Sequence, residues 1–350
     1  MKSLLNKINL ITIIALLGWC LQGTAQEVQF SQYYNLIQYQ NPAFVGTSYA
    51  LRGALHSRLQ WPALESRYFS TVAAVDYNLG KYNSGFGGML IMDDQGASAI
   101  KSYRGVFQYA YLLKLSPNLH LRSGLSLGFA RRILSNAALY YPDQFVGNGF
   151  SQNPETGSFV KNYVDVGTGM LLYANQFWLG FSASQLNNPN QSLIKGMDKL
   201  PARVDIIAGY KIILKSNATM RYLDSEDEDV WALYPTILYK MQGKADQLDI
   251  GIYSIYGIFK TGLWYRGLPI KNYEQNLINN EAIVALAGVK LSNFSVHYSY
   301  DFIISKLNPI AKGAHEINLT WYYPKIKNAK SKVKYKSLPC PGYYNNKLNN

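Results

Sequence analysis

Cysteine, histidine and long apolar runs are all scarce in this chain of 350 residues. It contains only 2 cysteines, which excludes a scaffold held together by disulfides. The 4 histidines show no metal-ligand spacing. After residue 25 no apolar run approaches the roughly 20 residues that a membrane-spanning helix needs. The sequence therefore excludes a helical membrane protein and gives no sign of a metal centre.

Acidic residues are also few, and the formal net charge is +13. The excess is unevenly placed, because two lysines lie before residue 10 and seven follow Pro324 without any acid. Only +4 is left for the remainder of the chain. No basic helix or aromatic stacking platform accompanies it, so we predict that nucleic acid is not a partner.

The first 25 residues have the pattern of a secretory signal peptide. Lys2 and Lys7 precede the apolar run Leu10–Leu17, and Gly23-Thr24-Ala25 supplies a small-residue cleavage site. Trp19 stands before Cys20 where a lipoprotein requires a small residue, so we predict ordinary cleavage before Gln26. An exported chain without a membrane helix is periplasmic, secreted or in the outer membrane.

Aromatic residues are abundant, with 29 tyrosines in the chain, and apolar and polar residues alternate over long stretches. Between residues 293 and 302, for example, Phe294, Val296 and Tyr298 fall on one face and Ser295 and His297 on the other. Such alternation over about ten residues is typical of a tilted strand with one face on lipid. Because a soluble β-sandwich also alternates, the whole chain has to be considered.

About fourteen segments keep this pattern, an even number as single-chain outer-membrane barrels require. They span residues 50–60, 68–78, 84–92, 100–115, 119–131, 160–173, 176–184, 202–214, 230–240, 246–254, 257–266, 281–291, 293–302 and 313–323. Connections after even-numbered strands are mostly short and those after odd-numbered strands mostly long, and a sandwich has no reason to sort its loops in this way. We therefore predict an all-β, transmembrane antiparallel barrel over residues 50–323, multi-pass in the outer membrane, with both termini periplasmic.

Three segments fall outside this pattern. Residues 26–49 mix polar and aromatic residues with the turn sequence Asn41-Pro42, and we predict an N-terminal plug or periplasmic segment there. The acidic run 224–229 is either a solvated turn or a contact for a basic partner. Residues 324–350 form a lysine-rich periplasmic tail, either a solvated segment or a docking arm.

Alternation also predicts a polar cluster inside the barrel. Arg58, Arg266, Asp301 and Glu316 all point inward near the extracellular end, and Arg58 and Glu316 bracket the seam between the first and last strands. We assign these four residues a structural role. Gly124-Leu125-Ser126-Leu127-Gly128 matches a hydrolase nucleophile pattern but lies inside an alternating strand, where a structural interpretation is favoured. We predict no catalytic residue and no cofactor.

The order of several short motifs resembles the PorP/SprF family of type IX secretion outer-membrane proteins. Near the start these are Phe30, Ser31, Gln32 and Tyr33, then Asn41, Pro42 and Ala43 with Gly46, then Gln60-Trp61. Near the end they are Trp264-Tyr265-Arg266, Tyr298-Ser299-Tyr300-Asp301, Gly313 with His315-Glu316-Ile317, and Cys340-Pro341. Together they cover nearly the whole mature chain.

The resemblance implies a non-enzymatic role in type IX secretion and gliding motility. Partners would be outer-membrane lipid, a large secreted surface adhesin recognised through its C-terminal domain, and periplasmic secretion or peptidoglycan-associated components. The alternative is a transporter of small hydrophobic compounds similar to the fatty-acid channels, which also have fourteen strands and an Asn-Pro-Ala in their N-terminal segment. A barrel lipase would need a Ser–His pair on the lipid face, and nothing in the sequence favours one.

Overall fold

The computed structural model describes residues 27–48, 51–64, 67–96, 100–135, 145–146, 149–150, 158–193, 196–215, 231–273, 277–291, 293–305, 312–323 and 338–341. Its strands are β1 (Leu51–Gln60), β2 (Tyr68–Leu79), β3 (Ser84–Asp94), β4 (Ile100–Lys114), β5 (His120–Ser135), β6 (Phe145–Val146), β7 (Gly149–Phe150), β8 (Ser158–Tyr173), β9 (Phe177–Ser184), β10 (Arg203–Tyr210), β11 (Ile212–Lys215), β12 (Trp231–Gln242), β13 (Ala245–Tyr256), β14 (Phe259–Tyr273), β15 (Leu277–Leu291), β16 (Phe294–Ile303) and β17 (Ala314–Tyr323). Short helices are α2 (Ile37–Gln40), η1 (Pro42–Phe44) and η2 (Gly80–Tyr82).

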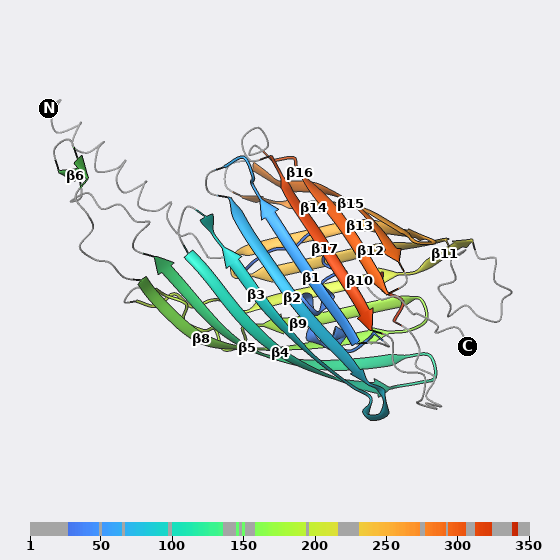
Figure 1. Ribbon diagram of the computed structural model, residues 1–350. Coiled ribbons are helices and arrows are strands. Elements are labelled where there is room, and N and C mark those ends of the chain that lie inside the picture. The colour runs from blue at the N-terminus through green and yellow to red at the C-terminus, as the bar shows by residue number, and fades with distance from the viewer. Residues whose placement is uncertain are drawn as a thin grey trace.

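The long strands form one closed antiparallel barrel (Figure 1). β1 pairs with β17 along its whole length, and β10 pairs with both β9 and β12, so no edge strand is left in this wall. β10 and β11 lie end to end against β12 and make one wall strand, whereas β6 and β7 form a separate hairpin. The wall therefore has fourteen strands, which confirms the predicted fold class.

The alternation of the sequence becomes the inside and the outside of the barrel. In β16, Tyr298 and Phe302 are exposed on the outer face, whereas His297, Ser299 and Asp301 are buried on the inner face. An apolar outer face and a polar inner face are what a barrel surrounded by lipid requires. Among the described residues, no helix is both long and apolar enough to cross a membrane.

Several strands are longer than the alternation predicts. β14 continues to Tyr273 and β15 starts at Leu277, so most of the long loop expected at 267–280 is paired strand. The ladder between them shifts register between Arg266 and Gly267 and again between Leu268 and Asn272. These irregularities interrupt the period-two pattern, which is why the sequence assigned the stretch to a loop.

The two ends of the barrel can be told apart by where the first strand begins and the last strand finishes. We call the end where β1 begins and β17 finishes the terminal end, and the other the opposite end. Residues 27–48, the inner segment, contact inner faces from β1 round to β17 and run from the opposite end to the terminal end. In Figure 1 this segment is the dark blue ribbon behind β1 and β2. Apart from residues 27–29 and Thr47, all of it is buried.

A second segment packs at the terminal end. Residues 338–341 are buried, and Cys340 belongs to the same apolar cluster as Tyr34 and Trp178. Lys260 of β14 donates a hydrogen bond to the carbonyl oxygen of Pro341 over 2.9 Å. These four residues of the tail are therefore docked, in contrast to the solvated segment that composition favours. The acidic run 224–229 and the remaining tail residues lie outside the described residues.

Candidate functional site

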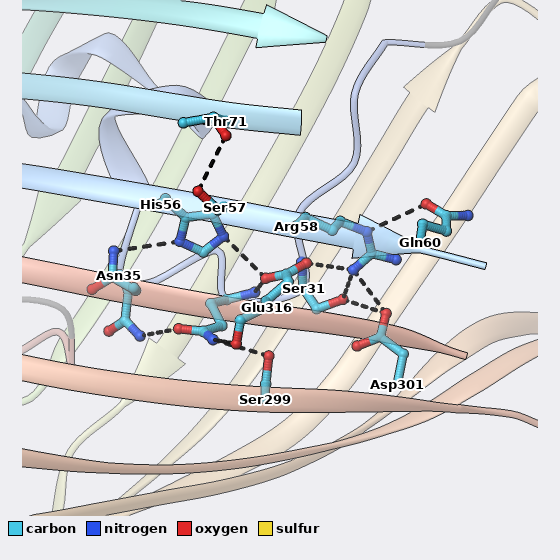
Figure 2. Close-up of polar contacts among 12 residues, drawn as sticks. Ser31, Asn35, His56, Ser57, Arg58, Gln60, Thr71, Ser299, Asp301 and Glu316 are labelled. Atoms are coloured by element: carbon cyan, nitrogen blue, oxygen red, sulfur yellow. Dashed lines mark hydrogen bonds and ion pairs between the residues drawn. The ribbon is translucent and has the colours of Figure 1, made fainter. Parts of the chain in front are cut away.

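The four inward residues singled out from the sequence lie in one network, and Figure 2 shows Arg58, Asp301 and Glu316 of it. Arg58 and Glu316 are direct partners in the β1–β17 ladder and form an ion pair on the inner face. The Arg58 Nη1 also donates to Asp301 Oδ2 over 2.9 Å, and Arg266 Nη1 reaches the same oxygen over 3.1 Å. Two guanidinium groups thus share one carboxylate, which links β1, β14, β16 and β17 across the inside of the barrel.

The inner segment is fastened to this network by Ser31 and Gln32. Both backbone N–H groups donate to the Glu316 carboxylate, over 2.6 Å from Ser31 and 2.9 Å from Gln32. The Ser31 hydroxyl donates to Asp301 Oδ2 over 2.6 Å, and Gln32 Nε2 donates to the hydroxyl of Ser299 over 3.0 Å. The Glu316 carboxylate therefore joins the seam of the barrel to the inner segment, as the sticks in Figure 2 show.

Aromatic residues of the inner segment fill the space on either side of this contact. The ring of Phe30 meets the His56 ring edge-on at 4.9 Å, and His56 Nε2 lies 3.1 Å from Glu316 Oε2. Tyr33 packs against the Trp264 ring at 5.9 Å, and its hydroxyl lies 3.1 Å from that of Thr236. Edge-to-face packing of this kind adds to the stabilisation that comes from burial alone.

The Asn-Pro-Ala turn is held close to the wall nearer the terminal end. Asn41 Oδ1 accepts from the backbone N–H of Ala43 and caps η1, while its Nδ2 donates to the carbonyl oxygens of Met170 and Phe181. Pro42 stands at the first position of η1, where a missing N–H costs nothing. The side chain of Asn41 therefore bridges the turn to β8 and β9.

Glycines of the wall make room for this turn. A Cβ on Gly124 would lie 2.4 Å from the backbone nitrogen of Ala43, and one on Gly169 would lie 2.1 Å from Asn41 Oδ1. Gly46 has a φ of +66° and approaches Gly85 of β3 closely. Gly124, the first glycine of the nucleophile-like motif, thus has a packing role inside β5.

A second charged cluster, which the sequence analysis missed, lies toward the opposite end. Glu27 of the inner segment forms ion pairs with Arg104 of β4 and Arg203 of β10. Arg104 also pairs with Asp165 over 2.7 Å. Burial by itself would raise the pKa of Glu27, but the two guanidinium groups outweigh it and hold the pKa below its ordinary value. A lone acid before the first strand gives no pattern from which these partners could be found.

Asp249 also belongs to the charged network around Arg266, and the sequence analysis did not single it out. It is fully buried and accepts from Arg266 Nε over 3.0 Å, and the two residues face each other in the β13–β14 ladder. The tight turn between these strands fixes the register, so counting back from it would have paired the two. Among the described residues no group of three or more His, Cys, Asp or Glu side chains could hold a metal ion. The arrangement is suited to fastening the inner segment by charge, not to bond-making chemistry.

Comparison with known proteins identifies the family. The family described as type IX secretion system membrane protein PorP/SprF matches residues 22–321. In structure the chain is similar to the toluene transporter TodX of P. putida, with 10% identity and a TM-score of 0.48 over 83% of this chain and 95% of that one. It is similar to Omp33 of Acinetobacter baumannii, with 8% identity and a TM-score of 0.42 over 79% and 100%.

A FadL homologue of Pseudomonas aeruginosa gives 8% identity and a TM-score of 0.41 over 82% of this chain and 94% of that one. No curated protein matches the chain. The family match extends over most of the sequence, from the inner segment to the last strand. The chain is therefore an outer-membrane, multi-pass β-barrel and belongs to the type IX secretion system membrane protein PorP/SprF family.

Proposed function

We propose that this barrel is a non-enzymatic part of the type IX secretion and gliding machinery that supports export or surface anchoring of a large adhesin. Membership in the family implies association with membrane lipid and with other components of the secretion system. In our proposal the adhesin is recognised through its C-terminal domain, and periplasmic components bind the terminal end.

The observation that carries this proposal is the occupied interior of the barrel. The inner segment is bonded to β1, β16 and β17 through Ser31 and Gln32, to β8 and β9 through Asn41, and to β4 and β10 through Glu27. In our proposal it acts as a plug. A barrel plugged in this way would act by offering surfaces to protein partners, since a secreted chain could not pass through its interior.

The terminal end is the surface that we assign to periplasmic partners. β1 begins there, β17 finishes there, and residues 338–341 pack there against Lys260. In our proposal this end faces the periplasm, so that the lysine-rich stretch after Pro324 contacts periplasmic ring or peptidoglycan-associated components. An epitope tag after Asn350 would then be stained by antibody only after the outer membrane is permeabilised. Staining of intact cells would contradict the orientation.

Deletion of the gene tests the function itself. The deletion strain should lose the adhesin from the cell surface, measured by antibody on intact cells, while uptake of a labelled fatty acid stays normal. Complementation with the intact gene should restore display. Normal adhesin display together with lost uptake would contradict the proposal.

One observation favours a second candidate, a transporter of small hydrophobic compounds. An apolar hollow of about 660 Å³ opens on the outer face of the wall. Small residues of β2, β3 and β4 form its floor, and larger outward residues such as Leu90 and Phe107 flank it. A hollow of this size and composition could receive a hydrocarbon. The uptake arm of the deletion experiment decides between the two candidates.

A further inference from the structure

A polar cavity of about 330 Å³ lies toward the opposite end of the barrel. It is bounded by the start of the inner segment, including Glu27, and by inward side chains of the wall, among them Arg203, Lys240, Gln247 and Glu281. Its volume is at the lower end of the range of small-molecule sites, so any ligand is small. The cavity adjoins the network that holds Ser31, because Gln247 Nε2 donates to the Asp249 carboxylate over 3.0 Å and Asp249 pairs with Arg266.

Lys240 lines this cavity without a hydrogen-bond partner, although the carboxylates of Asp249 and Asp205 lie near enough to interact with its charge. Its side chain is 8% exposed, yet within the described part of the chain it makes no hydrogen bond or ion pair. Asp205 faces it in the β10–β12 ladder and lies 3.0 Å from Arg203 as an ion pair, although neither of its carboxylate oxygens accepts a hydrogen bond. A buried ammonium group without an acceptor costs several kcal/mol, whereas an anion in the cavity would satisfy it.

The facing wall of the cavity carries acceptors that lack donors. The side chain of Glu281 on β15 makes no hydrogen bond or ion pair with any described residue, and Gln247 Oε1 on β13 is buried without a donor. Arg203 Nε, on the same side as Lys240, is a buried donor without an acceptor. Among the residues that line the cavity, the unmet donors therefore stand on β10 and β12, and the unmet acceptors on β13 and β15.

We propose that the cavity binds a short peptide, of two or three residues, through both of its charged ends. The carboxylate would accept from Lys240 and Arg203, and the ammonium group would donate to Glu281 and Gln247. β12 and β15 are three strands apart, about 14 Å along the wall, and inward-pointing side chains shorten that span. An extended peptide covers roughly 3.5 Å per residue, so two or three residues fit between the charges, whereas a single amino acid is too short.

The binding would also involve the inner segment, because Glu27, Val28 and Gln29 form one side of the cavity. A peptide seated between them and β12–β15 would add contacts that hold this end of the segment in place. This inference goes beyond the proposed function and is independent of the adhesin.

Calorimetric titration of the full chain in detergent, with trialanine and two blocked analogues, tests the proposal. Trialanine should bind with a stoichiometry of one. N-acetyl-trialanine lacks the ammonium group and trialanine amide lacks the carboxylate, and each should bind about 30-fold more weakly or worse, as when one member of a buried charge pair is removed. Equal affinity for trialanine and either analogue, or no saturable binding of trialanine, would overturn the proposal.

Two variants locate the ends of the peptide. Lys240→Met should lower the affinity for trialanine about 30-fold and leave the weaker affinity for trialanine amide unchanged. Glu281→Gln should also lower the affinity for trialanine about 30-fold, and should leave the weaker affinity for N-acetyl-trialanine unchanged. Lys101→Met is the matched control, because Lys101 is more than half exposed and pairs with Asp94 on the surface.

If neither variant changes the affinity for trialanine, the site is elsewhere and the proposal fails. If acetate or phosphate competes as well as trialanine, the cavity is an anion site and the proposal also fails. Because the analogue series uses the unaltered protein, it decides the question even where a variant does not fold.

Discussion

Glu316→Gln should release the inner segment from the seam of the barrel without opening the wall. The Glu316 carboxylate accepts hydrogen bonds from the N–H groups of Ser31 and Gln32, from Arg58, and has a contact of 3.1 Å to His56. A neutral amide has one acceptor oxygen, and its NH₂ group would face other donors. Arg58 would keep Asp301 as a partner at 2.9 Å.

The magnitude follows from these contacts. Removing one member of a buried ion pair typically costs about 3–5 kcal/mol, and we expect about 3 kcal/mol because Asp301 still neutralises Arg58. The β1–β17 ladder keeps its backbone hydrogen bonds, so the loss falls on the contact between the wall and the inner segment. About 3 kcal/mol corresponds to roughly a hundredfold change in a local opening equilibrium.

Amide hydrogen exchange followed by mass spectrometry measures this change. Peptides covering residues 30–40 should exchange about a hundredfold faster in the variant, while those from β4 keep wild-type protection. Asp94→Asn is the control, because that carboxylate meets Lys101 at 3.5 Å on the surface, with the two side chains 44% and 55% exposed. There we expect a change of about twofold or less.

Unchanged exchange of the inner segment in a folded Glu316→Gln barrel would refute the reasoning. Equal acceleration in β4 would also refute it, because the network would then hold the wall itself. Ser31→Ala gives a milder version, since it removes the hydroxyl that donates to Asp301 over 2.6 Å and accepts from Arg58 over 2.8 Å and Arg266 over 2.9 Å, while the Glu316 carboxylate stays in place. It should accelerate exchange about tenfold or more, in line with the roughly 1.5–3 kcal/mol of hydrogen bonds to charged groups.

Three further predictions concern other contacts of the buried segments. Gly124→Ala should lower the free energy of unfolding of the barrel by about 1–3 kcal/mol, because the added Cβ would lie 2.4 Å from the backbone of the Asn-Pro-Ala turn. Gly53→Ala, where the Cβ meets nothing within 4 Å, should be close to neutral, and equal effects of the two on the heat-induced gel shift would count against the packing role. Lys260→Met should speed alkylation of the buried Cys340 by a maleimide about tenfold or more, because the hydrogen bond to the Pro341 carbonyl over 2.9 Å is lost; equal alkylation rates would contradict the docking. Because the folded-state pKa of Glu27 is lowered, its contribution is complete above its ordinary value of 4.5 and is lost as the pH falls through the lowered value. The exchange difference between wild type and Glu27→Gln should therefore be large at pH 7 and disappear in strong acid, and a difference that persists there would exclude the ion pairs as its cause.

The sequence by itself determined the wall of this barrel. Lipid outside and a polar interior force alternate residues to alternate in polarity, so strand number, most strand positions and the inward direction of Arg58 and Asp301 could be read from period two. The meeting of Arg58 and Glu316 also followed, because closing a barrel makes the first and last strands neighbours. The irregular pairing after Arg266 was missed, because register shifts break the only pattern available.

Only the tertiary structure decided what fills the barrel. The inner segment has no periodicity. Ser31, Asn41 and Glu27 contact residues of β16, β8 and β10 that lie more than a hundred positions away in the sequence. Such contacts depend on the radius of the closed wall and on the places where glycine leaves room, as at Gly124. The docking of residues 338–341 beside Lys260 is of the same kind, since a lysine-rich composition favours a solvated tail. Local sequence fixes the faces of a strand, whereas pairing across the interior is set by three-dimensional distances that local sequence does not encode.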